Sequence, residues 1–309
     1  MGRCVGARKT AHPSPAQACK DTRRSELRLL ECVPNVSEGR SESAFDSLRK
    51  AAGTPLLDFH SDSDHNRCVL TLCDSEEILN SNIRALATET IETVDLRDHE
   101  GIHPRIGALD VVPFVSLERD ERGFISNGSI ESAISARNLF MAWAARTLDL
   151  PCFSYGPERS LPEVRRDAFR SIKPDTGPDA PHPTAGASAV GARPILVAYN
   201  VWLTTTNVDL ARSIAKSIRA PSVRALGMQV VNATQVSCNL IDPFETGPEP
   251  VYDAIARLAE SAGASVIRGE LVGLAPTKVV EAIPQHRRAE LGLSPEQTLE
   301  ARLEGSPVL

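Results

Sequence analysis

The sequence predicts an α/β fold whose sheets are covered by helices, and three observations lead to this prediction. Hydrophobic residues make up 41% of the 309 residues and charged residues 24%, so the chain can bury a sizeable core. From residue 29 onward, short apolar runs alternate with longer amphipathic segments, as strands and helices do in α/β proteins. Residues 173–194 interrupt this alternation with five prolines and three glycines, which divides the chain into halves of 29–192 and 193–309.

The elements of the first half follow from local periodicity. Phe45 and Leu48 share one helix face, and Ile134, Leu139 and Trp143 are near helical spacing. In chain order we expect a strand at 29–33, a helix at 42–52, strands at 54–59 and 67–72, a helix at about 76–96, a strand at 109–115, a helix at 130–147 and an extended segment at 152–155.

The same alternation resumes after the Gly/Pro-rich segment. We expect a strand at 195–203, a helix at 208–219, strands at 228–233 and 235–241, a helix at about 249–262, a strand at 265–272 and a short C-terminal helix. The Gly/Pro-rich segment itself is either a functional loop or a domain linker, because structureless segments of that length are uncommon inside compact domains.

Residues 1–28 differ from the rest of the chain in charge. Seven basic residues stand against Asp21 and Glu26, whereas the whole chain has a net charge of −6. The segment lacks the apolar core of a secretory signal, so we expect a basic, disordered extension. A transit peptide stays open as an alternative because acidic residues are scarce.

Composition argues against several classes of protein. The net charge of −6 and the aromatic content of 4% disfavour a nucleic-acid-binding protein. No apolar run reaches the roughly 18–20 residues of a membrane span. The seven cysteines are scattered without a CxxC pair, which favours reduced thiols and a cytoplasmic location over disulfides or a zinc site.

The sequence lacks the motifs GxxxxGK[ST], GxGxxG and GxSxG, so the common nucleotide and serine-hydrolase signatures are missing. Four polar segments remain at strand ends, where α/β sheets tend to form their sites. The first contains Asn35, Ser37, Glu38 and Arg40. Backbone N–H groups there could bind an anion, or the segment could simply turn the chain and cap the next helix.

The second polar segment, residues 60–67, places two histidines and two aspartates within six positions, ahead of Asn66 and Arg67. These side chains could ligate a divalent metal or hold an ammonium group of a substrate. The glycine and the distal glutamate of a calcium-binding loop are missing. A solvated loop between two strands is the alternative.

The third polar segment, residues 98–110, contains His103, Arg105 and Asp110. Pro104 fixes the backbone beside His103. A histidine that titrates near neutrality, with a carboxylate to orient it, is suited to proton transfer, so His103 and Asp110 are candidate catalytic residues. A packed structural histidine is the alternative.

The fourth polar segment, residues 175–186, is rich in glycine and proline. These residues leave little side chain between the backbone and a planar ligand, so the segment could bind a flat molecule. Composition alone does not distinguish this function from that of a linker.

Taken together, the four segments resemble the formiminotransferase family. In the first half the resemblance rests on ECVPNVSEGR at 31–40, Leu57-Asp58 followed by Asn66-Arg67, HPRIGALD at 103–110 with Pro113-Phe114, and Leu161-Pro162 ahead of Arg165. In the second half it rests on Gly177-Pro178, Gly186-Ala187, VGAR at 190–193, AYN at 198–200, QVSCNL at 235–240 and LVGLAP at 271–276. The motifs are collinear over about residues 30–283.

The resemblance implies a fold of two subdomains with mixed β-sheets that face each other, helices on the outer faces and a ligand tunnel between them. It implies transfer of the formimidoyl group from N-formimidoyl-L-glutamate to N5 of tetrahydrofolate, as in histidine degradation and one-carbon metabolism. Tetrahydrofolate is then a co-substrate, with no metal or nucleotide expected. A homodimer is common in the family, whereas the helical cyclodeaminase domain of bifunctional relatives is not expected in this chain.

The resemblance also assigns residues. His103 maps to the catalytic acid/base, with Asp110 as the carboxylate that could orient it. Substrate-binding candidates are Asn35, Ser37, Glu38, Arg40, His60, Asn66, Arg67 and Arg105. The folate-binding segment maps to Gly177, Pro178, Asp179, Ala180, Pro181, His182, Pro183, Thr184, Ala185 and Gly186. Some relatives carry an acidic residue at the position of His60, a role that Asp62 or Asp64 could take over.

Three other functions stay open at this stage. An ATP-dependent 5-formyltetrahydrofolate cyclo-ligase would keep the ligand and change the reaction. A metal-dependent hydrolase would use the loop from His60 to His65. A folate-binding protein without turnover would bind reduced folate and transfer nothing.

Overall fold

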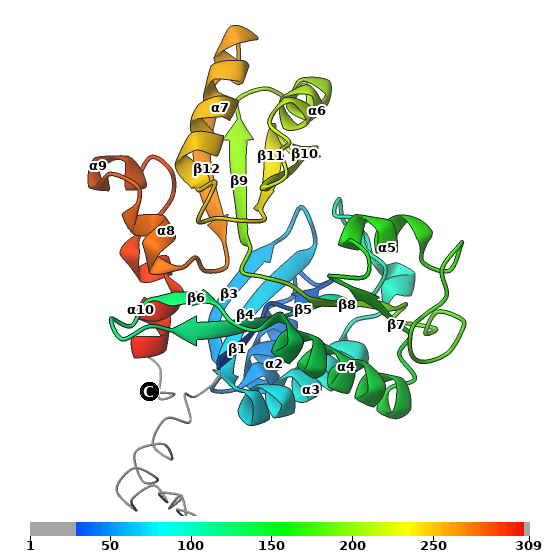
Figure 1. Ribbon diagram of the computed structural model, residues 1–309. Helices are drawn as coiled ribbons and strands as arrows, with labels where there is room; N and C mark the ends of the chain where they lie inside the picture. Colours follow the sequence, from blue (N-terminus) through cyan, green and yellow to red (C-terminus); the bar gives the residue numbers. More distant parts are fainter. Residues whose placement is uncertain (1–28, 306–309) are drawn as a thin grey trace, which may run out of the picture.

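The computed structural model describes residues 29–305, and the basic segment 1–28 lies outside the described residues. Two β-sheets with helices packed against them form the molecule (Figure 1), which confirms the predicted α/β fold class. None of the helices described between residues 29 and 305 has the length and hydropathy of a membrane span. The five cysteines in this range are free and buried, as expected of reduced thiols, whereas Cys4 and Cys19 lie outside it.

The first sheet is built from the first half of the chain. Its strands are β1 (Leu29–Cys32), β2 (Asn35–Val36), β3 (Leu56–Asp62), β4 (Arg67–Ser75), β5 (Leu109–Arg119), β6 (Ile125–Asn127), β7 (Cys152–Tyr155) and β8 (Ser188–Ala192). Strand β8 pairs in parallel with β5 and with β7, whereas the other pairings are antiparallel. This sheet is therefore mixed, as expected.

One face of the first sheet is covered by α2 (Glu42–Ala52), α3 (Glu76–Thr93) and α4 (Ile130–Thr147), as Figure 1 shows. Their apolar side chains, among them Leu48 and Phe140, pack with Leu70 of β4 into one core. The hydroxyl of Ser41 accepts from the Ala44 N–H, which explains why α2 begins at the predicted residue. A 3₁₀ turn η1 (Leu96–Asp98) and a short helix α5 (Leu161–Asp167) complete this half.

The second sheet has the order β10-β11-β9-β12. Its strands are β9 (Val197–Leu203), β10 (Val223–Val230), β11 (Ala233–Leu240) and β12 (Val266–Val272), and the helices α6 (Val208–Ser217) and α7 (Pro248–Ser261) cover one face. All three strand pairings are antiparallel, so the expectation of a mixed sheet is wrong for this half. The hairpin between β10 and β11 makes the direct antiparallel connection that a parallel pair could not make.

The C-terminal segment is more than the single helix expected. It contains α8 (Thr277–Glu281), α9 (Gln285–Arg288), a 3₁₀ turn η2 (Pro295–Gln297) and α10 (Leu299–Glu304). In α10, Leu299 packs with Leu57 of the first sheet. The buried Glu300 carboxylate accepts from the N–H groups of Ile125 and Thr277, each at 2.8 Å. The second half of the chain thus returns to the first sheet.

Two predictions about strands are corrected by the structure. The strand predicted at 228–233 has the wrong bounds, because β10 runs from Val223 to Val230 and the hairpin turn follows, where Val231 is 69% exposed. The segment 173–194 contains β8, which pairs inside the first sheet, so this segment is not a free linker. The division of the chain at 192/193 stays a prediction. Strands β2 and β6 and helix α5 were not predicted because two to seven residues are too few to show a period.

Candidate active site

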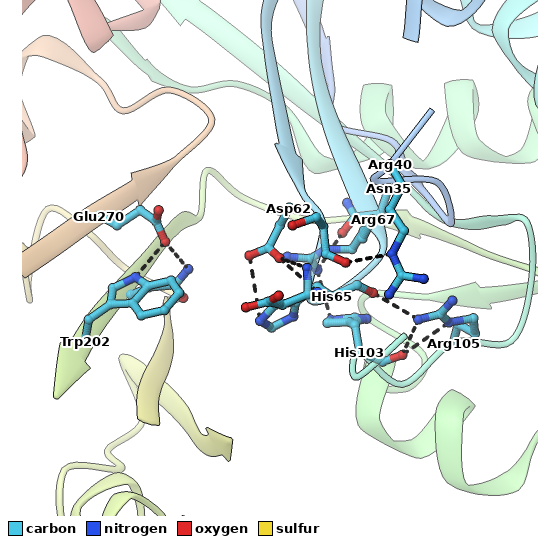
Figure 2. A network of polar contacts seen from close by, with 12 residues as sticks. Asn35, Arg40, Asp62, His65, Arg67, His103, Arg105, Trp202 and Glu270 are labelled. Atoms are coloured by element: carbon cyan, nitrogen blue, oxygen red, sulfur yellow. Dashed lines mark hydrogen bonds and ion pairs between the residues drawn. The ribbon is translucent and has the colours of Figure 1, made fainter. Parts of the chain in front are cut away.

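A polar network forms where the segments 35–40, 62–67 and 99–110 meet (Figure 2). Ser37 fixes the first segment to the third, because its hydroxyl donates to Gly107 O at 2.8 Å and its N–H donates to Ala108 O at 2.7 Å. Ser37 is 2% exposed, so its hydroxyl is used in this contact and holds the site together.

Asn66 joins all three segments. Its side-chain oxygen accepts from the Gly39 N–H at 2.9 Å, and its amide donates to Glu100 O at 2.8 Å. Its φ of 46° is a left-handed conformation that asparagine tolerates better than most residues. The structure therefore gives Asn66 a positioning role at the predicted site.

Arg67 and His103 lie in direct contact, although 36 positions separate them in the chain. The Arg67 guanidinium donates to His103 Nε2 at 2.9 Å and to Asn35 Oδ1 at 3.2 Å. A guanidinium has donors only, so His103 Nε2 is the acceptor and the ring carries its proton on Nδ1. The sequence-predicted residues Asn35, Arg67 and His103 are thus brought together.

The charge of Arg67 has no carboxylate partner within ion-pair distance among residues 29–305, and its Nε is buried without a hydrogen bond. Burial lowers the pKa of Arg67 to about 10. Burial, followed by the charges of Arg67 and Arg165, holds the pKa of His103 far below its ordinary value. In this geometry His103 is a neutral imidazole in a cationic site, not a group that titrates near neutrality.

Among the described residues Asp110 forms no hydrogen bond with His103, so the expected pairing of this carboxylate with the ring is wrong. Asp110 is 1% exposed, accepts from the Ile106 N–H at 2.7 Å and forms an ion pair with Arg165 at 2.6 Å. Arg165, which comes from α5, also donates to the carbonyl of Pro104. Asp110 therefore fixes the segment that carries His103.

Arg105 also holds this segment. Its guanidinium donates to His103 O at 3.0 Å and to His65 O at 3.1 Å, and it contacts the ring of His99. Burial lowers the pKa of Arg105, as it does that of His99. Arg105 adds positive charge to the site.

The remaining substrate-binding candidates lie at the edge of the network. The Glu38 carboxylate accepts from the N–H groups of Arg40 and Ser41, which shows the turn and helix-capping role that the sequence left open. Arg40 is exposed and donates to Ser63 O at 3.0 Å. His60 is half-buried on β3, opposite Val69 of β4.

The predicted folate-binding segment divides into an exposed part and a part that pairs with the His103 segment. Pro178 to Pro181 are exposed, and Asp179 forms a surface ion pair with Lys173. At the other end the Gly186 and His182 backbones pair, and the Ala108 N–H donates to Ala185 O at 2.9 Å. Gly186 has φ 68°, and a Cβ there would lie 2.4 Å from Ile106 O, so glycine is required.

Residues of the second sheet lie across from this network, and sequence reasoning missed two of them. Figure 2 shows Trp202 of β9 and Glu270 of β12 opposite Asp62 and His65. Glu270 accepts from Trp202 Nε1 at 3.0 Å and from the Asn200 amide at 3.1 Å. Only Asn200 belonged to a motif named above; Trp202 and Glu270 lie on neighbouring strands that only the fold brings together.

The second polar segment does not gather its acids and histidines around one point. One oxygen of Asp62 accepts from the backbone N–H groups of Asp64 and His65. Within residues 29–305 no group of three His, Cys, Asp or Glu side chains is arranged to hold a metal ion.

Fold and site together define an α/β protein of two sheets, with a cationic site built on histidine and arginine beside a Gly/Pro-rich loop. Residues 29–193 match the family model described as the formiminotransferase domain, N-terminal subdomain, and residues 198–289 match the model of the formiminotransferase domain. The chain therefore belongs to the formiminotransferase family and is a transferase.

Individual relatives agree with this assignment. The chain is 33% identical to the glutamate formimidoyltransferase of Streptococcus pyogenes over 84% of this chain and 93% of that protein. It is 30% identical to the glutamate formimidoyltransferase of Thermoplasma acidophilum over 90% of this chain and 98% of that protein. It is also 33% identical to the formimidoyltransferase-cyclodeaminase of Gallus gallus, of which it covers 51%.

Proposed function

We propose that the protein transfers the formimidoyl group from N-formimidoyl-L-glutamate to N5 of tetrahydrofolate, giving 5-formimidoyltetrahydrofolate and L-glutamate. The observation that carries the proposal is the contact between Arg67 and His103, in which a half-buried guanidinium, with its Nε buried, lacks a carboxylate partner. Two relatives of nearly the same length are named for this activity.

Charge complementarity supports anionic substrates. N-formimidoyl-glutamate carries two carboxylates, and arginine binds carboxylates through charge-assisted hydrogen bonds. Arg67 donates to the ring of His103, and Arg105 donates to the backbone carbonyl of the same residue. A carboxylate of the substrate would give Arg67 the partner that it lacks in the protein.

The reaction is an attack of N5 on the formimidoyl carbon followed by release of glutamate. N5 loses a proton, and the departing nitrogen gains one, which makes general acid–base catalysis worth roughly 10²–10⁴-fold. We propose His103 as a catalytic histidine. Its Nε2 becomes free to take part in proton transfer when Arg67 turns from the ring to a carboxylate of the substrate.

The folate-binding role of residues 177–186 stays a proposal, as does a ligand tunnel between the sheets. The pairing of Ala185 with Ala108 supports it, because it places this segment beside the strand that follows His103. Tetrahydrofolate bound there would be a co-substrate. A cytoplasmic location, a homodimer and a place in histidine degradation are proposed on the family resemblance and on the free, buried cysteines.

The test is to incubate the purified protein with N-formimidoyl-glutamate and tetrahydrofolate, with and without ATP, and to follow both products by mass spectrometry. We expect glutamate and 5-formimidoyltetrahydrofolate in equal amounts and without ATP. Turnover of 5-formyltetrahydrofolate that requires ATP, with no transfer from formimidoyl-glutamate, would refute the proposal in favour of the cyclo-ligase. Activity that a chelator abolishes would favour a metal-dependent hydrolase, and folate binding without turnover would favour a binding protein.

A further inference from the structure

His65 is a buried histidine whose ring makes no hydrogen bond in the described part of the chain. The residue is 3% exposed, and both Nδ1 and Nε2 lack a partner. Its backbone is fixed, because its N–H donates to Asp62 Oδ1 at 2.8 Å and its carbonyl accepts from Arg105 at 3.1 Å. An unpaired buried polar group costs about 1–3 kcal/mol, so a rigid loop that retains two such nitrogens points to a role in ligand contact.

The position of this ring relates it to the reaction. The ring centres of His65 and His103 are 5.9 Å apart. The His65 Nε2 lies 3.9 Å from Asp62 Oδ2, which is too long for a hydrogen bond. Figure 2 shows His65 on the side of the network that faces Glu270 of the second sheet.

The two histidines differ in the use of their nitrogens. His103 Nε2 accepts from Arg67, so that lone pair is occupied until Arg67 moves. His65 has no such hydrogen bond to break, since one neutral ring nitrogen has a lone pair with no partner, although neighbouring atoms cover both ring nitrogens. Of the two rings, His65 is thus the one whose lone pair no protein group occupies.

Burial keeps His65 a neutral base. Burial lowers the pKa of His65, Arg67 acts in the same direction, and the carboxylates of Asp62, Asp64 and Glu270 oppose them. The neighbouring His103 is itself neutral at physiological pH. A neutral imidazole is the form that can take up a proton.

Resting on the proposed function, we propose that His65 is a second acid–base residue of the transfer. His65 takes the proton from N5 as the bond between N5 and the formimidoyl carbon forms. The two rings share no hydrogen bond, so the relay requires that Arg67 leave His103 Nε2 and that the imidazoles approach to hydrogen-bond distance. The proton then passes through His103 to the nitrogen of glutamate, as the bond between that nitrogen and the formimidoyl carbon breaks. One proton leaves N5 and one arrives at glutamate, so the step balances without a further reactant.

The test compares His65→Gln, His103→Gln and the double variant in the full chain, with His286→Gln on the exposed α9 as the matched control. We expect kcat to fall about 100-fold or more in each single variant, and the double variant to be no worse than the slower single one, because both residues serve one proton path. His286→Gln should keep full activity. A His65→Gln enzyme with kcat within twofold of the wild type, or a double variant whose loss is the product of the single losses, would overturn the inference.

Two further measurements separate a proton-transfer role from a structural one. The pH profile of kcat should lose the same limb in His65→Gln and in His103→Gln, while the thermal midpoint stays within about 2 °C of the wild type. In nitrogen-15-labelled protein, addition of 5-formyltetrahydrofolate together with glutamate should shift the His65 ring nitrogens. If the wild type transfers no formimidoyl group, the proposed function fails, and unchanged His65 nitrogens would then refute this inference separately.

Discussion

Replacing Arg67 by methionine should leave the protein as stable as before or more stable, while it impairs the reaction. Arg67 is charged and buried at its Nε, and its hydrogen-bond partners, Asn35 and His103, are both neutral. Methionine keeps the length of the apolar stem and removes the charge. A residue kept for packing would show the opposite behaviour.

The expected magnitude follows from the pKa of Arg67. One pKa unit corresponds to about 1.4 kcal/mol, so a guanidinium pKa lowered to about 10 means an unfavourable free energy on the order of 3 kcal/mol for the charge. The two lost hydrogen bonds oppose this gain by about 1 kcal/mol each. We therefore expect the free energy of unfolding to rise by roughly 0–2 kcal/mol, or the thermal midpoint by about 0–4 °C for a chain of this size.

The assay is urea denaturation at pH 7.5 beside steady-state kinetics, with Arg170→Met on the exposed surface as the control. Arg170→Met should stay within about 0.5 kcal/mol of the wild type. In Arg67→Met, KM for formimidoyl-glutamate should rise about 10–100-fold, as for the loss of one charged hydrogen bond. Since Arg67 lowers the pKa of His103, the ring should titrate at a higher pH by NMR in this variant.

One outcome would refute this reasoning. If Arg67→Met loses more than about 2 kcal/mol of stability and keeps its KM for formimidoyl-glutamate, the role of Arg67 is to stabilise the fold and not to bind an anionic substrate. The conclusion that the charge of Arg67 is unfavourable in the folded protein would then be wrong.

The other predictions concern the groups around the same site. His103→Gln should lower kcat by about 10²–10⁴-fold with nearly unchanged folate affinity by calorimetry; a less stable but fully active variant would speak against it. Asp110→Asn breaks the ion pair with Arg165, so the thermal midpoint should fall by about 2–6 °C, for roughly 1–3 kcal/mol, and the limb of the pH profile should stay where it is. Because the folded-state pKa of His103 is depressed, the unfolded chain binds more protons below pH 6.5, and stability should fall on acidification by up to about 1.4 kcal/mol per pH unit, less steeply in His103→Gln. Burial raises the pKa of Glu31 to about 7, so its contribution to folding stability is present at low pH and is lost as pH rises through 7. This trend opposes the loss of stability on acidification that His103 causes. Glu31→Gln removes the opposing trend and should therefore make stability fall more steeply on acidification. Gly186→Val combines φ 68° with a clash on a carbonyl oxygen, so it should cost more than about 2 kcal/mol by urea denaturation, and an unchanged midpoint would contradict the fold described for this turn.

Local chemistry was enough to predict the long elements of the fold. Helix α2 begins after the cap at Ser41, and α2 and α4 match their predicted bounds because apolar residues recur at helical spacing. The prediction failed at Val231, where an apolar residue lies in an exposed hairpin turn, because β-propensity does not distinguish a strand from the turn that ends it. Antiparallel pairing in the second sheet depends on which strands meet, and no local pattern contains that information.

Contacts between residues far apart in the sequence were even harder to predict at the site than in the fold. The resemblance to a family singled out Asn35, Arg67 and His103, and the structure brings these three together. Nearness in sequence was misleading for Asp110, since it lies seven positions after His103 yet forms its ion pair with Arg165, 55 positions away. Trp202 and Glu270 of the second sheet belong to no motif, because their positions on the strands show only ordinary alternation in the sequence.

Arg67 and Arg165 differ in their charge partners, which the sequence does not show and the structure does. Arg165 has its carboxylate in Asp110, so its charge is neutralised within the protein and stabilises the fold. Arg67 has none among residues 29–305, and the burial that lowers its pKa makes its charge unfavourable for the folded protein. A bound carboxylate would form the ion pair with Arg67 that no carboxylate of the described residues forms. Arg67 would then break its hydrogen bond to His103 Nε2. Binding of the anionic substrate and release of the imidazole lone pair would then be one event, so a site occupied by folate alone should keep His103 neutral and unreactive.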